Sequence, residues 1–135
     1  MEISDILIVD DDTDLRRTLF RVLSKIYKVV EAANGKEALH YLKTQRPHLV
    51  LLDITMPEMS GIEVLHAARE LDETLRIVMV TSHQEMELAK SALDLGAIAY
   101  LTKPFDANFI LGEVARLLAP IEADKSGGRP WRVVK

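Results

Sequence analysis

Two stretches of the chain pass directly from apolar residues into aspartate: Ile6-Leu7-Ile8-Val9-Asp10-Asp11-Asp12 and Leu49-Val50-Leu51-Leu52-Asp53. Short apolar runs rich in branched side chains are typical of strands buried on both faces of a sheet. Carboxylates repel one another and resist removal from water. A fold that brings these two strand ends together must therefore hold positive charge between them. A hard divalent cation fits best, because it prefers oxygen ligands.

Outside these stretches, short apolar runs alternate with amphipathic segments. Three further strands are predicted at residues 27–32, 77–80 and 99–102. Apolar residues at helical spacing predict five helices, with stripes at Leu15, Leu19, Val22, Leu23 and Ile26; Ala38, Leu39 and Leu42; Ile62, Leu65, Ala68 and Leu71; Leu88, Ala89, Ala92, Leu93 and Leu95; and Phe109, Ile110, Val114, Leu117 and Leu118. The predicted helix boundaries are N-caps at Asp12 or Thr13, at Asn34 (with Glu37 completing a box-like start) and at Asp106, and stops at Gly96 and Pro120.

This alternation predicts an α/β fold, a five-stranded parallel sheet with helices on both faces, flavodoxin-like. Ligands of such sheets bind at the carboxyl ends of the strands. Four strands are followed there by acids, hydroxyls or a lysine: Asp10-Asp11-Asp12, Asp53, Thr81-Ser82 and Lys103. The strand that ends at Glu31-Ala32 offers no comparable group. We therefore place it at an edge, in the strand order 2-1-3-4-5.

The composition indicates one globular domain. The chain has 135 residues, of which 48% are hydrophobic and 28% charged, with no cysteine. We expect the domain to span residues 1–120 and residues 121–135 to form a basic tail or linker. Residues 125–135 hold four basic and no acidic residues, which leaves 13 basic and 21 acidic residues, a net charge of −8, in residues 1–124. This acidic body argues against direct nucleic-acid binding.

The sequence shows no membrane span and no secretory signal, which favours a cytoplasmic location. No apolar stretch approaches the roughly 18–20 residues of a membrane span. The first residues, Met1-Glu2-Ile3-Ser4-Asp5, lack the basic start of a secretory signal. We expect a cytoplasmic protein without a membrane partner.

The polar residues at the strand ends form a coherent set for phosphoryl chemistry. Two or three carboxylates suffice to hold Mg²⁺ or Mn²⁺. An ionised carboxylate is also a nucleophile that can form an acyl phosphate. A phosphoryl group in transfer needs positive partners and hydrogen-bond donors, which Lys103 and Thr81 supply. The predicted site is therefore complete for accepting a phosphoryl group.

The chain resembles the receiver domains of response regulators in two-component signalling. The resemblance covers about residues 4–119 and rests on four stretches in order, residues 6–12, Leu51 to Gly61, Val80-Thr81-Ser82 and Tyr100 to Phe105. It implies that Asp53 is the phosphoryl acceptor. It also implies that Asp11 binds the metal directly, Asp10 largely through water, and Thr55 through its backbone carbonyl.

The resemblance assigns further roles. Thr81 would hydrogen-bond a phosphoryl oxygen, and Lys103 would pair with Asp53 or its phosphate. The Lys103-Pro104 peptide bond would be cis. Tyr100 would be an aromatic switch, although core packing is a rival role. Thr55 and His83 occupy positions that tune phosphate lifetime in this family.

The same resemblance implies the partners. A sensor histidine kinase or phosphotransfer protein would donate the phosphoryl group, docking near Asp14, Leu15, Thr18 and Pro104-Phe105. A downstream output domain or effector, or a second copy of the chain in a phosphorylation-linked homodimer, would bind the fourth helix, fifth strand and fifth helix. The domain would be a signalling switch that assists its own phosphorylation and dephosphorylation, and not an enzyme.

Two other functions remain open from the residues. Asp10-Asp11-Asp12-Thr13 is similar to the start of a phosphohydrolase of the haloacid-dehalogenase type, although its threonine comes one place early. A receiver-like binding module that is never phosphorylated is the other, although such modules usually lack one of the acidic groups. We expect packing or surface roles for the scattered histidines, His40, His48, His66 and His83.

Overall fold

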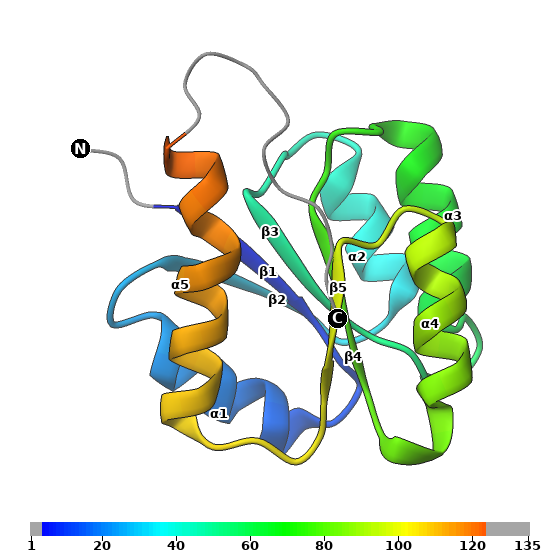
Figure 1. Ribbon diagram of the computed structural model, residues 1–135. Coiled ribbons are helices and arrows are strands. Elements are labelled where there is room, and N and C mark those ends of the chain that lie inside the picture. The colour runs from blue at the N-terminus through cyan, green and yellow to red at the C-terminus, as the bar shows by residue number, and fades with distance from the viewer. Residues whose placement is uncertain (1–3, 124–135) are drawn as a thin grey trace.

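Five parallel strands form the sheet in the computed structural model, which describes residues 4–123 (Figure 1). The strands are β1 (Asp5–Val9), β2 (Lys28–Ala32), β3 (Leu49–Asp53), β4 (Ile77–Thr81) and β5 (Ala99–Thr102). Their order is β2-β1-β3-β4-β5, with every neighbouring pair parallel. The predicted fold class and strand order are therefore confirmed.

Helices cover both faces of this sheet. They are α1 (Thr13–Leu23), α2 (Gly35–Leu42), α3 (Gly61–Leu71), α4 (Met86–Asp94) and α5 (Ala107–Ala123), and a short 3₁₀ turn, η1 (His83–Glu85), precedes α4. Figure 1 shows α1 and α5 on one side of the sheet and α2, α3 and α4 on the other.

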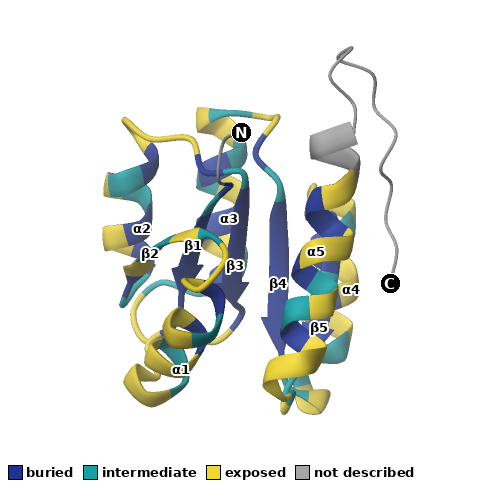
Figure 2. Cartoon of the chain, turned by 90° about the vertical axis from the view of Figure 1, so that its left-hand side faces the viewer, coloured by how far each residue is buried: buried dark blue, intermediate teal, exposed yellow. Residues whose placement is uncertain are grey.

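The alternation of side chains along each strand divides the core into two hydrophobic layers. Leu7 and Val9 of β1 pack with buried residues of α2, α3 and α4. Ile6 and Ile8 pack with buried residues of α1 and α5. Figure 2 shows β3 and β4 buried throughout, whereas the helices expose their outer faces. Burial on both faces explains why the central strands are continuous apolar runs, whereas the edge strand β2 exposes Lys28 and Glu31.

The predicted caps hold. The Leu15 amide donates to the Asp12 carboxylate at 3.1 Å, so Asp12 caps α1. The Glu37 amide donates to Asn34 at 2.9 Å, while the Glu37 side chain accepts from Ala33. The Phe109 amide donates to Asp106 at 2.8 Å. Gly96, which follows α4, has a φ of +112°, a conformation that favours glycine.

Some boundary predictions were wrong. The first helix ends at Leu23 because the chain turns there into β2, and Ile26 is 55% exposed. Pro120 does not close the last helix, which continues to Ala123. A proline removes one backbone donor, and the backbone can remain helical around it at a cost. The predicted stripes were also too wide, since four further residues in them, besides Ile26, are exposed: Leu71, Leu88, Leu95 and Phe109.

None of the helices within residues 4–123 combines the length and apolar character needed to cross a bilayer. A domain boundary at residue 120 stays a prediction. Of the predicted basic tail, residues 124–135 lie outside the described residues.

Candidate functional site

Three carboxylates meet where β1 and β3 end. Asp53 is the last residue of β3 and is 5% exposed, and Asp10 directly follows β1 and is 2% exposed. Asp11, the next residue, is exposed to solvent. One carboxylate oxygen from each lies within 4.8 Å of the other two. The structure therefore brings together the three aspartates that the sequence proposed as metal ligands.

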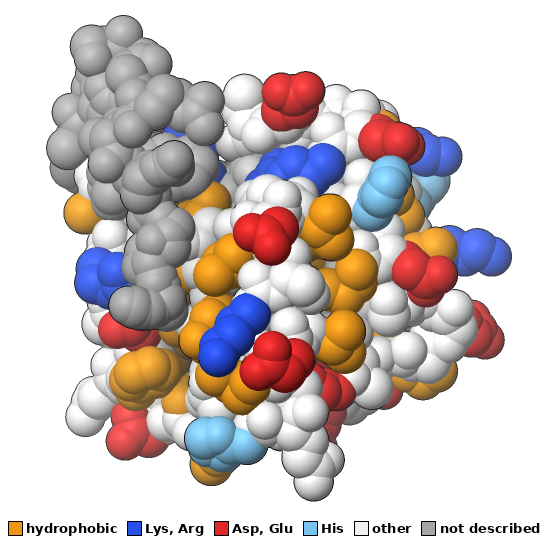
Figure 3. All heavy atoms as spheres, turned by 45° about the vertical axis from the view of Figure 1, so that its right-hand side comes forward, with side chains coloured by type: hydrophobic (Ala, Val, Ile, Leu, Met, Phe, Trp, Pro, Cys, Tyr) orange, Lys and Arg blue, Asp and Glu red, His pale blue; other side chains and the backbone are white. Residues whose placement is uncertain are grey.

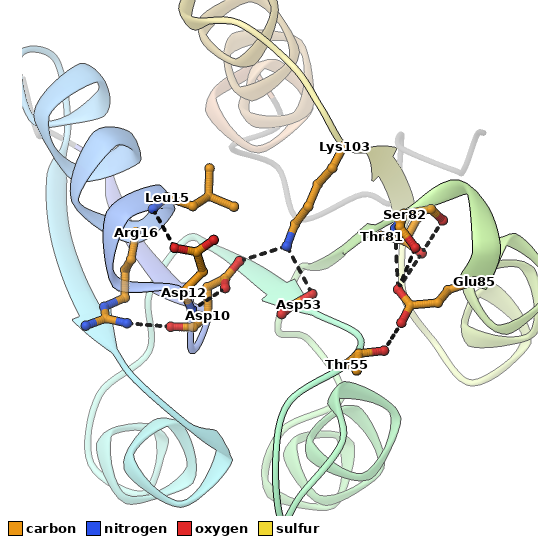
Figure 4. Close-up of polar contacts among 10 residues, drawn as sticks. All are labelled: Asp10, Asp12, Leu15, Arg16, Asp53, Thr55, Thr81, Ser82, Glu85 and Lys103. Carbon is orange, nitrogen blue, oxygen red and sulfur yellow. Dashed lines mark hydrogen bonds and ion pairs between the residues drawn. The ribbon is translucent and has the colours of Figure 1, made fainter.

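Lys103 lies directly after β5 and bridges two of these carboxylates (Figure 4). Its Nζ is 3.4 Å from Asp53 Oδ1 and 3.3 Å from Asp10 Oδ2. The sequence predicted the first pair and not the second. The Lys103-Pro104 peptide bond is cis, as the resemblance implied, and the Lys103 amide donates to the Thr81 carbonyl at 2.6 Å.

The charged groups at this site shift one another's pKa values. Burial, and secondarily Asp10, raises the pKa of Asp53 from 3.8 to about 7, although Lys103 opposes the shift. Burial acts to lower the pKa of Lys103, but the two carboxylates outweigh it and the pKa is raised. The site thus carries more negative charge than one lysine neutralises. Hard oxygen ligands with excess negative charge fit a Mg²⁺ or Mn²⁺ ion.

A second polar cluster lies beside Asp53 at the end of β4. Thr81 is fully buried, and its hydroxyl donates to the Ser82 carbonyl at 3.1 Å and to Glu85 at 3.4 Å. The Glu85 carboxylate also accepts from the Ser82 amide at 3.4 Å and from the Thr55 hydroxyl. Sequence reasoning missed Glu85. The spacing Ser82-x-x-Glu85, typical of a capping box, was the signal that could have found it.

A positively charged side chain of α1 also contacts the loop that holds Asp10. Arg16 of α1 donates from Nη1 to the Asp10 carbonyl oxygen at 2.6 Å. Its Nε lies 3.0 Å from Glu31 Oε1 on β2. The edge strand therefore does contribute to the site, indirectly through Arg16. The sequence analysis assigned no role to either residue.

The loop after β3 wraps tightly around the site. The Gly61 amide donates to the Ile54 carbonyl at 2.7 Å. A Cβ atom at Gly61 would lie only 2.1 Å from the Asp53 carbonyl oxygen, so the close approach of α3 requires glycine here. This contact fixes the backbone of the residue that would accept the phosphoryl group. Thr55, in the same loop, is exposed.

The remaining candidates lie further out. Tyr100 is half-buried and packs against the layer under α2, α3 and α4, so its switch role stays a prediction. His83 is exposed in η1, and His40 and His66 are exposed as well. His48 has the expected packing role, since its Nδ1 accepts from the Asp5 amide at 2.9 Å. None of these histidines joins the metal-capable cluster found in the described part of the chain.

A parallel sheet with three carboxylates, a lysine and a hydroxyl at the carboxyl ends of its strands holds the groups that phosphoryl transfer to a carboxylate requires. The family model of the response regulator receiver domain matches residues 6–115. The chain belongs to this family, whose members are switches of two-component systems.

Two relatives show how far the likeness extends. Sporulation initiation phosphotransferase F of Bacillus subtilis is 40% identical over 114 residues, 84% of this chain and 92% of that protein. Response regulator MprA of Mycolicibacterium vanbaalenii is 37% identical over 91% of this chain but only 54% of its own length. The chain thus spans nearly all of the first relative and about half of the second.

Solved structures agree with this assignment. A CheY-like receiver domain protein from Methanospirillum hungatei superposes with a TM-score of 0.85 and 32% identity, covering 91% of this chain and 99% of that one. NtrX from Brucella abortus gives a TM-score of 0.85 at 29% identity, with 93% of this chain matching 29% of that one.

Proposed function

We propose that Asp53 accepts a phosphoryl group from a phosphohistidine of a sensor kinase or phosphotransfer protein, in a reaction that requires Mg²⁺ or Mn²⁺. The observation that carries this proposal is the position of the Asp53 carboxylate, buried between two further carboxylates and the Lys103 ammonium. No comparable observation favours a phosphohydrolase, and the family match argues against it.

The transfer step needs only groups that are already placed. An Oδ atom of ionised Asp53 forms a bond to phosphorus while the phosphorus–nitrogen bond of the donor breaks, and the electron pair returns to the imidazole nitrogen. Lys103 Nζ, 3.4 Å from Asp53 Oδ1, would balance charge on the phosphoryl oxygens. Thr81 would donate its hydroxyl to one of them.

The acidic residues would hold the metal. We assign Asp11 as a direct ligand, Asp10 largely through water, Asp53 as the third carboxylate and Thr55 as a backbone carbonyl donor. When bound, the ion would supply positive charge to the transferred phosphoryl oxygens and keep Asp53 ionised. The raised pKa of Asp53 supports this role, because a neutral carboxyl group would be a poor nucleophile.

The phosphohistidine donor would dock beside the site mouth. Leu15 and Thr18 of α1 line a small, mainly apolar hollow together with Phe105 and Ile110 from the β5–α5 side. This hollow contains three of the positions that the sequence proposed for kinase docking. Asp14 and Pro104, both exposed, are the flanking candidates.

Phosphorylation would change the surface formed by α4, β5 and α5. Movement of Thr81 toward the phosphoryl group would vacate space that Tyr100 fills, which changes the surface presented to an output domain, an effector or a second copy of this chain. Leu88 and Leu95, on α4 and directly after it, are 49% and 45% exposed and offer apolar contacts. Figure 3 shows hydrophobic side chains mixed with charged ones on this side of the molecule.

Phosphodonor labelling tests the acceptor. Incubation with phosphoramidate and Mg²⁺ should add one phosphoryl group to the intact mass, and chelation of the metal should prevent it. Asp53→Asn should abolish the adduct, whereas Asp94→Asn, at an exposed position of α4, should label like wild type. Equal labelling of the Asp53→Asn variant would refute the assignment.

A further inference from the structure

We propose that Glu85 is a positioning residue of the phosphoryl site, whose carboxylate ties Thr81 to Thr55 and competes with the incoming phosphoryl group for the Thr81 hydroxyl. This inference rests on the proposed function of Asp53. It gives a role to a residue that the sequence motifs leave unassigned.

The contacts of Glu85 form a clamp between two strand-end loops. Oε1 accepts from Thr81 Oγ1 at 3.4 Å and from Ser82 Oγ at 3.3 Å. Oε2 accepts from the hydroxyl of Thr55, which lies thirty residues away on the loop after β3. In Figure 4 the Glu85 side chain lies between Thr81 and Ser82 on one side and Thr55 on the other. One carboxylate thus ties the end of β4 to the loop that follows the acceptor.

The clamp cannot persist once Asp53 carries a phosphoryl group. The Thr81 hydroxyl has one proton, so it cannot donate fully to both Glu85 and a phosphoryl oxygen. A phosphoryl group also brings a charge of about −1.5 to −2, which repels the Glu85 carboxylate. Glu85 must therefore release Thr81, and the intact clamp favours the unphosphorylated state.

Release of Glu85 would also affect the proposed partner-binding surface of α4, β5 and α5, because Glu85 directly precedes α4. Glu85 is the last residue of η1, and α4 begins at the next residue, Met86. The Met86 sulfur accepts from the Thr102 hydroxyl at the end of β5, at 3.7 Å. Loss of the contacts that hold Glu85 would free the first turn of α4 together with this contact.

The test is a titration with beryllium trifluoride and Mg²⁺, a stand-in for phosphate on Asp53, followed by amide shifts. Glu85→Gln keeps the shape of the side chain but removes its charge, and it should bind the probe roughly fivefold or more tightly. Without probe, its Thr81 and Ser82 amide signals should already lie toward their probe-saturated positions. A purely structural role for Glu85 would not predict tighter binding.

Glu87→Gln is the matched control, since Glu87 lies in the first turn of α4, two residues after Glu85, with its carboxylate 3.9 Å from Lys90 and its side chain 92% exposed. It should bind the probe like wild type. A Glu85→Gln variant that binds no more tightly than Glu87→Gln would overturn the role of Glu85. Failure of wild type itself to bind the probe would instead refute the proposed function of Asp53, and this inference with it.

Discussion

The charge crowding around Asp53 makes the stability of the metal-free domain depend on pH. Burial and the neighbouring Asp10 raise the pKa of Asp53 from 3.8 to about 7. Between these values the folded chain binds a proton that the unfolded chain does not. Stability therefore rises as the pH falls from 7 toward 4, and above pH 7 the domain carries the full cost of the ionised group.

The size of this effect follows from the shift. A shift of roughly three units at 1.36 kcal/mol each gives an upper limit of about 4 kcal/mol. Because Asp53 shares its charge interactions with Asp10 and Lys103, part of the proton uptake is distributed over the site. We therefore expect the free energy of unfolding to fall by about 1–3 kcal/mol when the pH is raised from 5 to 8. The lowered pKa of Asp72 acts below this window and does not interfere.

Urea unfolding of wild type and Asp53→Asn, followed by circular dichroism in a chelating buffer, measures this difference. Asparagine mimics the neutral carboxyl group, so the two proteins should be similarly stable at pH 5, and the variant should be more stable by about 1–3 kcal/mol at pH 8. Saturating Mg²⁺ should narrow the gap by stabilising wild type. Parallel stability profiles from pH 5 to 8 would refute the reasoning.

Other substitutions probe single contacts of the site. Asp11→Asn removes a hard anionic ligand; it should weaken Mg²⁺ binding and slow phosphorylation together, and unchanged affinity in an amide-shift titration would contradict the ligand role. Lys103→Ala should still label slowly but shift less toward the active form; a phosphorylated variant that binds the downstream partner as well as wild type would reduce Lys103 to a structural counter-ion. Arg16→Met removes the donor 2.6 Å from the Asp10 carbonyl and should weaken Mg²⁺ binding several-fold, about 1 kcal/mol. Arg17→Met, at an exposed neighbouring position, should leave Mg²⁺ affinity unchanged. Equal Mg²⁺ affinities of the two variants would exclude a role of Arg16 in holding Asp10. Gly61→Ala places a methyl group 2.1 Å from the Asp53 carbonyl oxygen. It should lower the free energy of unfolding, measured by thermal unfolding, by about 2 kcal/mol or more. Wild-type stability of this variant would show that the loop after β3 rearranges without cost.

The fold was predictable because its central strands, β1, β3 and β4, are buried on both faces. Continuous apolar runs identified β3 and β5 to the residue, and the polar residues that follow the strands indicated their order. Helix ends were less predictable, since an apolar residue at helical spacing, such as Ile26, can also lie in a turn.

The central site residues were predictable because each ends a strand or follows one within two residues. Glu85 and Arg16 were missed because their roles depend on partners far along the chain, Thr55 and Glu31. Such pairs carry no local pattern. They arise only when the sheet brings separate loops to one edge.

The division of the core into two layers bears on how such a domain changes during evolution. The proposed donor hollow lies between α1 and the start of α5, whereas α4 packs in the opposite layer with α2 and α3. Substitutions on the exposed side of α1 can therefore alter the choice of upstream donor without repacking the residues beneath α4. A duplicated copy of the gene could thereby acquire a new donor while retaining the α4 part of its proposed output surface.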